Sequence, residues 1–160
     1  ILILWNFWEI NLLVILFQKK LGMWWLKFLH LLLILKMELM MSNKNVGNDG
    51  EKRAVDYLIE NGYKILFRNW RLSGGEIDII ALKDDVLVFV EVKTLPNSTV
   101  DMLEKVLNKE KQKRIIKMSK RFLQNHREYI NGYIRFDVII IDMKGLPPIY
   151  HIENAFSESL

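Results

Sequence analysis

The sequence predicts a mixed α/β domain in the order α, β, β, β, α, β, β, with a three-strand antiparallel meander flanked by helices. Three observations carry this prediction. Apolar residues recur at helical spacing near residues 49–61, and a long helical segment follows near 99–125. Between them lie three short segments rich in aromatic and β-branched residues, separated by turn residues. The segment 133–142 is apolar on both faces and indicates a further strand.

The first helix is expected over Asp49 to Asn61, with Gly62 in the left-handed cap that commonly ends a helix. The turn Ser73-Gly74-Gly75 separates the first two strands, and Asp84-Asp85 separates the second and third. The strands of the meander are expected at Tyr63 to Trp70, Glu76 to Lys83 and Val86 to Lys93.

After the meander, Leu95 to Thr99 contains a proline and is expected to be a loop. Ser98 followed by Asp101 resembles a capping box, which predicts a long helix from about Thr99 to about Asn125, with Asn108 as a point where it could break. The last two strands are expected at Tyr133 to Asp142 and near Ile149 to Ile152.

Composition excludes several kinds of site. The chain of 160 residues has no cysteine, so disulfides, thiolate zinc sites and cysteine nucleophiles are absent. The three histidines show no metal-ligand spacing, so any metal should be held by carboxylates, which favour Mg²⁺ or Mn²⁺. A formal charge of +4 is compatible with a polyanionic partner.

Residues 1–40 differ from the rest of the chain. They are mostly apolar, hold four of the five tryptophans, and are interrupted too often for a clear membrane span. The chain begins with Ile1, whereas Met40 and Met41 precede a polar stretch typical of cytosolic proteins. We therefore expect a cytoplasmic domain over residues 41–160. For residues 1–40, upstream translation is favoured over a marginal membrane segment, and a membrane partner is expected only if this segment is genuine.

The Asp84-Asp85 turn sets the register of the second and third strands. A two-residue loop pairs Lys83 with Val86, and counting back along both strands places Asp78 opposite Glu91. Opposed side chains have Cβ atoms roughly 4.5 to 5.5 Å apart, so two carboxylates there destabilise the hairpin unless something between them compensates, as a divalent cation would. The same register places Glu76 opposite Lys93, on the face that carries Glu91.

This arrangement suits phosphodiester hydrolysis. Asp78 and Glu91 could hold a cation that polarises a phosphate, while the Lys93 ammonium offsets developing charge. The alternative is a structural one, in which Asp78 is solvated at the hairpin edge and Glu76 and Lys93 form an ordinary surface ion pair. The apolar residues around Asp78 and Glu91 favour the functional interpretation, because buried carboxylates need partners.

Glu51 is a fourth acid of interest. It lies three, four and seven residues before Ala54, Val55 and Leu58, which places it on the buried side of the first helix. Two interpretations stay open: a metal role, or an acid favourably placed in the first turn of the helix.

Several short motifs make the chain recognisable. They are Gly47 to Glu51, Asn69 with Arg71, Gly75 to Ile79, Phe89 to Thr94, Lys111 with Gln112, and Arg135 to Val138. In order and spacing these motifs resemble the YraN-like family of uncharacterised bacterial proteins, predicted endonucleases of the restriction-endonuclease-like superfamily similar to archaeal Holliday-junction resolvases.

The resemblance implies a restriction-endonuclease-like core and a Mg²⁺- or Mn²⁺-dependent nuclease over residues 41–160. It implies Asp78 and Glu91 as metal ligands, Lys93 as the catalytic lysine, and Glu51 as an accessory acid. Glu76 is expected to assist. The resolvase likeness suggests branched DNA and a homodimer. Leu95 departs from the pattern, since the family usually has arginine there.

Basic residues supply a candidate nucleic-acid surface. Lysines and one arginine recur every four residues along the second helix. This spacing is compatible with two interpretations, contact with a phosphate backbone and an ordinary solvated helix face, and favours neither. The predicted nucleic-acid contacts are Arg68, Arg71, Lys109, Lys111, Gln112, Lys113, Lys117 and Arg121. Nothing resembles a base-reading motif, so binding should be structure-selective or nonspecific. The rival function is a nucleic-acid-binding or adaptor module that keeps the fold without cleaving.

Overall fold

A computed structural model describes residues 24–102 and 108–157 of the chain. Helix α2 (Trp24–Glu60) is the first described element. It starts much earlier than the expected Asp49 and runs through the boundary at residue 45, where the chain divides into two compact units. Among the described residues, no helix combines the length and hydropathy needed to cross a membrane.

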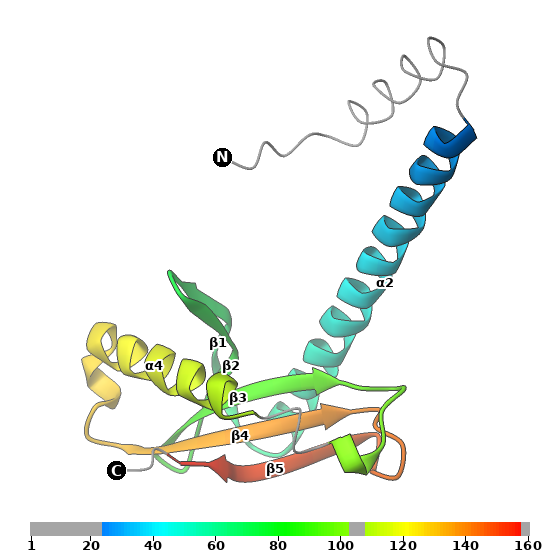
Figure 1. Cartoon of the computed structure of the whole chain (residues 1–160). Helices are drawn as coiled ribbons and strands as arrows, with labels where there is room; N and C mark the ends of the chain where they lie inside the picture. Colours follow the sequence, from blue (N-terminus) through cyan, green and yellow to red (C-terminus); the bar gives the residue numbers. More distant parts are fainter. Residues whose placement is uncertain (1–23, 103–107, 158–160) are drawn as a thin grey trace. The chain divides into compact units, whose positions relative to one another are not determined.

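A five-stranded mixed sheet forms the centre of the second unit, residues 46–160 (Figure 1). Its strands lie in chain order, and all neighbours are antiparallel except the third and fourth, which are parallel. The strands are β1 (Lys64–Leu72), β2 (Gly75–Lys83), β3 (Val86–Thr94), β4 (Tyr133–Ile141) and β5 (Ile149–Phe156). The predicted α/β fold, with its antiparallel meander, is confirmed and is compatible with a restriction-endonuclease-like core.

The turn between β2 and β3 has the predicted two-residue loop. Asp84 and Asp85 both adopt positive φ, 47° and 63°, as a type I′ turn requires. Lys83 pairs with Val86, and the register continues unbroken to Ile79 opposite Val90. The register deduced from the sequence is therefore correct over this part of the hairpin.

The connection from β3 to β4 contains helix α4 (Lys109–Asn125), as a parallel pair of strands requires. The expected helix start at Thr99 is wrong. Only a 3₁₀ turn, η1 (Val100–Met102), lies in that region, and residues 103–107 fall outside the described part of the chain. Asn108 caps α4, since its side-chain oxygen accepts a hydrogen bond from the Lys111 amide at 2.9 Å.

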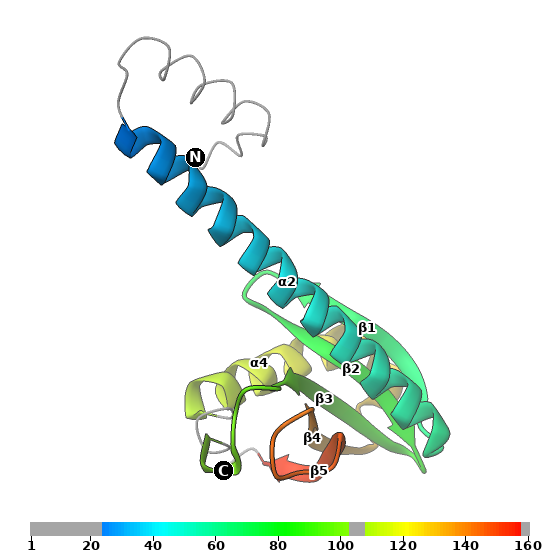
Figure 2. The ribbon, with the colours of Figure 1, turned by 90° about the vertical axis from the view of Figure 1, so that its right-hand side faces the viewer.

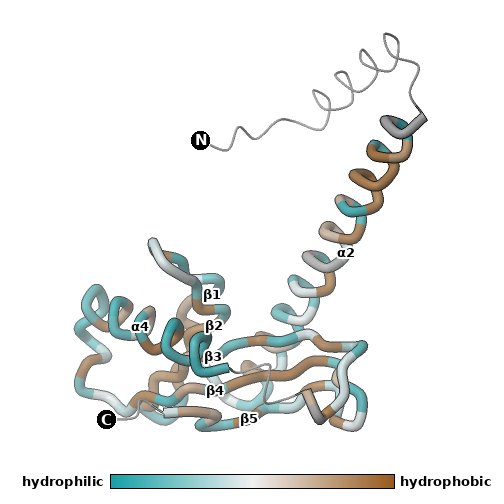
Figure 3. Tube along the Cα trace, viewed as in Figure 1, coloured by the Kyte–Doolittle hydropathy of each residue, from teal (hydrophilic) through white to brown (hydrophobic). Residues whose placement is uncertain are grey.

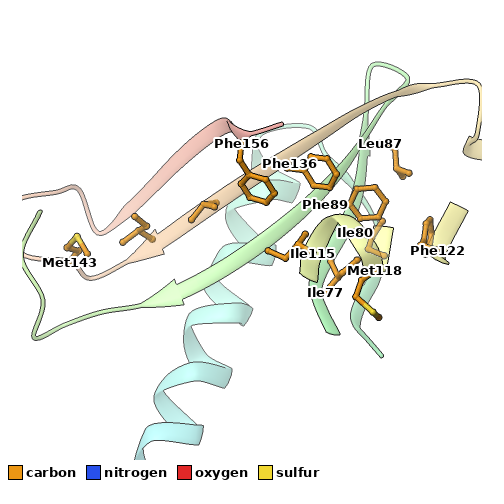
Figure 4. Packing of buried hydrophobic residues seen from close by; sticks show 12 residues of the cluster. Ile77, Ile80, Leu87, Phe89, Ile115, Met118, Phe122, Phe136, Met143 and Phe156 are labelled. Carbon is orange, nitrogen blue, oxygen red and sulfur yellow. The ribbon is translucent and has the colours of Figure 1, made fainter. Parts of the chain in front are cut away.

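Helix α4 covers one face of the sheet. Ile115, Met118 and Phe122 are buried against strand residues that include Phe89 and Phe136 (Figure 4). Along the tube in Figure 3, the rest of α4 is largely hydrophilic and the central strands are largely hydrophobic. The helix is thus held by an apolar stripe on one side, and its remaining surface is free to carry charge.

The C-terminal turns of α2 cover the opposite face (Figure 2). Ala54, Val55 and Leu58 are buried in a second apolar cluster with side chains of the three central strands. Helix α2 ends as expected, because Gly62 has a φ of 82° and its amide donates to the Ile59 carbonyl. Side chains that alternate along β3 therefore belong to two separate packed layers.

Close contact between α2 and the end of β3 depends on Gly50. A Cβ built on this buried glycine would lie 1.8 Å from Thr94 Oγ1 and 3.1 Å from Thr94 Cβ, so a larger residue forces Thr94 or the helix to shift. Since Thr94 follows Lys93, this contact also fixes α2 beside the strand end that carries Glu91 and Lys93.

Replacing Gly50 by alanine should therefore destabilise the domain despite the higher helix propensity of alanine. We expect the free energy of unfolding to fall by about 1 to 3 kcal/mol, the usual cost of overpacking. Gly47 is the matched control, because a Cβ there meets no described atom within 4 Å. Gly47→Ala should be neutral or stabilising by up to about 1 kcal/mol. Urea denaturation of both variants measures the difference, and equal effects would contradict the contact.

Candidate metal centre

Asp78 lies where the regular pairing of β2 is interrupted on both sides. The pairing between β1 and β2 skips Asn69 and Asp78, and Asn69 has a φ of 50°. The pairing between β2 and β3 ends at Ile79 and Val90. Beyond this point Asp78 Oδ2 accepts a hydrogen bond from the Val92 amide at 2.8 Å. The carboxylate, with only 8% of the residue exposed, thus serves as an acceptor for the neighbouring strand.

Glu91 is the most buried acid of the site, with 1% of the residue exposed. It follows Phe89 by two residues on β3, so it faces the α4 side of the sheet. Its Oε1 lies 2.5 Å from Lys93 Nζ and 2.8 Å from Lys111 Nζ. These ion pairs lack hydrogen-bond geometry, and neither oxygen of Glu91 has a hydrogen-bond donor among the described residues.

The surroundings of Asp78 favour its protonated form. The pKa of Asp78 is raised to about 7, chiefly by burial and also by the negative charge of Glu91. The Val92 amide, Lys93 and Lys111 act in the opposite direction. A carboxyl group with such a pKa is half protonated near neutrality. The ionised form of Asp78 is therefore disfavoured in this structure, chiefly because the carboxyl group is buried.

The donor set fits a hard divalent cation. Glu91 Oε2 has no partner in the described part of the chain, and Asp78 is destabilised as an anion, so a cation between these carboxylates would satisfy both. Among the described residues, no three His, Cys, Asp or Glu side chains group closely enough to hold a metal ion. The remaining positions around a cation would belong to water, backbone or substrate oxygens.

Two predicted acids lie apart from this pair. Glu51 is half-buried on α2, and its Oε2 accepts a hydrogen bond from Asn69 Nδ2 at 2.9 Å. It approaches the site through Asn69 and does not form a three-acid cluster with the others. Glu76 is not opposite Lys93 as predicted, because the β2–β3 pairs end before reaching it. Its Oε2 instead pairs with Arg71 Nε at 2.8 Å.

Lys111 has a different place from the one that the sequence suggested. The sequence predicts a nucleic-acid contact for Lys111 and does not predict that its ammonium lies against buried Glu91, as it does in the structure. The sequence does contain a signal for this position. Lys111 stands four residues before Ile115 and seven before Met118, at the start of the buried stripe of α4.

The other predicted basic residues lie on or near the surface of the fold. Arg68 on β1 is exposed, and Arg121 donates to the Ser73 carbonyl at the β1–β2 turn. On the far side of α4 a pocket of about 580 Å³ is lined by Lys109, Gln112, Lys113, Ile116, Lys117, Lys120 and Ser157. The predicted stripe is thus present on α4, and its first member, Lys105, lies outside the described residues.

The Arg135 to Val138 motif forms a separate polar network. Asp137 is fully buried and accepts hydrogen bonds from Arg135 and the Asn154 amide, with His151 Nε2 at 2.8 Å. Burial raises the pKa of Asp137, but the His151 and Arg135 hydrogen bonds outweigh it and lower the pKa below its usual value. Asp137 pairs with Val90, so its side chain lies on the α2 face of the sheet. The Glu91 side chain lies on the other face, which α4 covers. This motif is satisfied within the fold and has a structural role.

Comparison with known proteins agrees with the motifs. Residues 50–141 match the uncharacterised protein family UPF0102. The chain belongs to this family. A UPF0102 protein of Treponema denticola is 42% identical over 125 residues, covering 71% of this chain and 96% of its own length. Its counterpart in Treponema pallidum (strain Nichols) is 44% identical over 120 residues, covering 72% and 95%.

A third UPF0102 protein, from Geobacter metallireducens, is 44% identical over 115 residues and covers 71% of this chain and 93% of its own length. The family resemblance read from the sequence motifs is therefore confirmed. The names of these relatives state no activity, so the function rests on the site.

Proposed function

We propose that this UPF0102 protein is a divalent-metal-dependent nuclease that hydrolyses DNA phosphodiesters at the Asp78–Glu91 pair. The observation that supports this most is the buried Glu91 carboxylate, whose Oε2 has no partner among the described residues. Its neighbours are a second buried acid and two ammonium groups. A purely structural carboxylate at such depth would be satisfied by hydrogen bonds, as Asp137 is.

Asp78 and Glu91 would hold a Mg²⁺ or Mn²⁺ ion, which when bound supplies Lewis-acid polarisation of a phosphate and a lowered pKa for water. The Glu91 side chain is held in a buried position on β3, with 1% of the residue exposed. Asp78 must lose its proton to take part, since its pKa is about 7. The Val92 amide orients the carboxylate by donating to Oδ2.

Lys93 supplies the positive charge at the reacting phosphate. Its side chain is one-third exposed, so the ammonium can reach a bound strand while staying near Glu91. Positive charge held beside a phosphate stabilises the charge that develops during displacement. Lys111 contributes a second ammonium from α4, less exposed than the first.

A non-catalytic nucleic-acid-binding module is the second candidate. It is favoured by one observation: the two lysines already pair with the same oxygen of Glu91, which neutralises the carboxylate without a metal. In that case Asp78 and Glu91 would organise a basic surface only. The two candidates differ in whether the protein cleaves DNA when Mg²⁺ is added.

A cleavage assay on single-stranded, duplex and four-way DNA tests the proposal. We expect cleavage that needs Mg²⁺ or Mn²⁺ and stops with EDTA, with the four-way substrate preferred. Lys93→Gln should lower the rate about 100-fold or more, as loss of a charge-stabilising donor does. Lys64→Gln is the control, because Lys64 is exposed at the other end of the sheet.

Tight DNA binding without metal-dependent cleavage would support the binding module instead. Equal rates for Lys93→Gln and the wild type would show that the cleavage does not come from this site. Gel filtration of the protein with and without four-way DNA tests the predicted homodimer.

A further inference from the structure

A small basic pocket borders the metal centre. It has a volume of about 280 Å³ and lies between the β1–β2 turn and the first turns of α4. Its lining residues are Arg71, Leu72, Gly75, Glu76, Lys111 and Arg114, and we call it the turn pocket. Three cationic side chains and one acid give it a net positive charge, which suits a single anionic group.

Lys111 belongs to both the turn pocket and the metal centre. The residue lines the pocket, while its Nζ lies 2.8 Å from Glu91 Oε1. A group bound in the pocket is therefore one side chain away from the carboxylate that would hold the metal. In a nucleic acid every nucleotide carries a phosphate, so a neighbour of the reacting phosphate can fall within this reach.

Gly75 keeps this side of the site close to α4. A Cβ at Gly75 would lie 3.1 Å from Met118 Cγ and 3.5 Å from Arg114 Cγ. The absence of a side chain lets the stem of Arg114 lie against the start of β2. Arg114 is thereby directed along the pocket wall, although its exposed position on α4 gives it freedom at the guanidinium end.

Arg71 and Glu76 form an exchangeable pair at the pocket. Arg71 Nε lies 2.8 Å from Glu76 Oε2, with the side chains 69% and 45% exposed. Such exposed pairs contribute little to stability, so Arg71 can move to another anion at small cost. A guanidinium binds a phosphate with two parallel hydrogen bonds, which makes a phosphate the stronger partner.

We propose that the turn pocket binds one phosphate of the DNA strand, adjacent to the phosphate that is hydrolysed. Arg114 and Arg71 hold its oxygens, and Lys111 links this phosphate to the Glu91 side of the metal centre. The proposal rests on the proposed function and adds a defined subsite to it. The lysines that line the other pocket, Lys109, Lys113, Lys117 and Lys120, are not part of this subsite.

A methylphosphonate scan tests this subsite without relying on cleavage. Each phosphate of a labelled duplex is made neutral in turn, and binding is measured by fluorescence anisotropy in Ca²⁺, with the DNA verified intact on a denaturing gel. For the wild type we expect one position where neutralisation weakens binding about tenfold, the effect of losing a hydrogen bond to a charged group. That position should be next to the cleavage site mapped in Mg²⁺.

Arg114→Gln supplies the decisive comparison. In this variant the same methylphosphonate should change binding by less than twofold, because the Arg114 guanidinium that would pair with the charged phosphate has been removed. The slope of log affinity against log salt concentration should also become shallower by about 1, as expected for the loss of one phosphate contact. Arg127→Gln, an exposed arginine beyond the end of α4, should keep the wild-type profile. Thermal unfolding of each variant verifies that it is folded.

The outcomes separate the two proposals. A wild-type protein that binds DNA but shows the same profile after Arg114→Gln would overturn the turn pocket as a phosphate subsite while leaving the nuclease proposal intact. A wild-type protein that binds no DNA would overturn both. Sensitivity to neutralisation spread evenly over many positions in the wild type would also reject a single subsite.

Discussion

Glu91→Gln is expected to reduce Mg²⁺-dependent DNA cleavage by at least about 100-fold, because it removes the buried charge that would hold the metal. The substitution keeps the size of the side chain in a position with 1% exposure. Lys93 and Lys111 lose their shared partner, yet both side chains are partly exposed and can turn to water. The domain should therefore remain folded.

The cleavage rate at saturating DNA measures this effect, with DNA affinity determined separately by anisotropy. Affinity should stay within severalfold of the wild type, since the variant gains net positive charge. Glu60→Gln is the control for the same chemical change, because Glu60 is exposed at the end of α2. Cleavage by Glu91→Gln at the wild-type rate would place the chemistry elsewhere.

Asp78→Asn is expected to stabilise the metal-free domain, by about 2 to 3 kcal/mol more at pH 8 than at pH 5. In the folded protein the pKa of Asp78 is about 7, against an ordinary value of 3.8. Between these values the folded state binds more protons than the unfolded state, so stability falls as pH rises through this range. Above pH 7 the full penalty remains, on the order of 4 kcal/mol.

Asparagine removes the charge and keeps an oxygen that can accept the Val92 amide hydrogen bond. Urea denaturation in EDTA at both pH values measures the difference between variant and wild type, in which other titrating groups largely cancel. Adding Mg²⁺ at pH 8 should stabilise the wild type and not the variant. A constant difference across pH would contradict the burial of a titrating Asp78.

The strand register could be predicted because it depends on a local feature. Asp84 and Asp85 suit the left-handed turn conformation, and the alternation of apolar residues fixes which face each side chain takes. The approach of Asp78 to Glu91 followed from counting along two strands. The expectation that their carboxylates hold a metal comes from the family resemblance, since the same pattern also permits a structural pair.

Two predictions were wrong, the start of the second helix and the position of Glu76, because they depend on contacts that the sequence pattern does not show. The helix start was placed at Thr99 because Ser98 and Asp101 match a capping box, whereas Asn108 caps the helix in the structure. Glu76 was placed opposite Lys93 by extending an ideal ladder. The β2–β3 ladder ends at Ile79 and Val90, and beyond this point the Asp78 carboxylate accepts the hydrogen bond of the Val92 amide in place of a backbone carbonyl.

The position of Lys111 shows that the sequence of a basic helix does not by itself reveal which lysine faces the sheet. Lysines spaced every four residues look equivalent in the sequence, yet one of them begins the buried stripe of α4 and reaches Glu91. The helix must be docked on the sheet before the two kinds of lysine can be distinguished. Its apolar stripe fixes that docking, through Ile115, Met118 and Phe122.

The most direct test of the proposed metal centre is Mn²⁺ binding at pH 8, followed by electron paramagnetic resonance. We expect the wild type to bind Mn²⁺ with a site that is lost in both Asp78→Asn and Glu91→Gln and retained in Glu60→Gln. Loss in both variants would establish that the two carboxylates share one ion. Equal Mn²⁺ binding by the wild type and both variants, or none by the wild type, would contradict a metal held by Asp78 and Glu91.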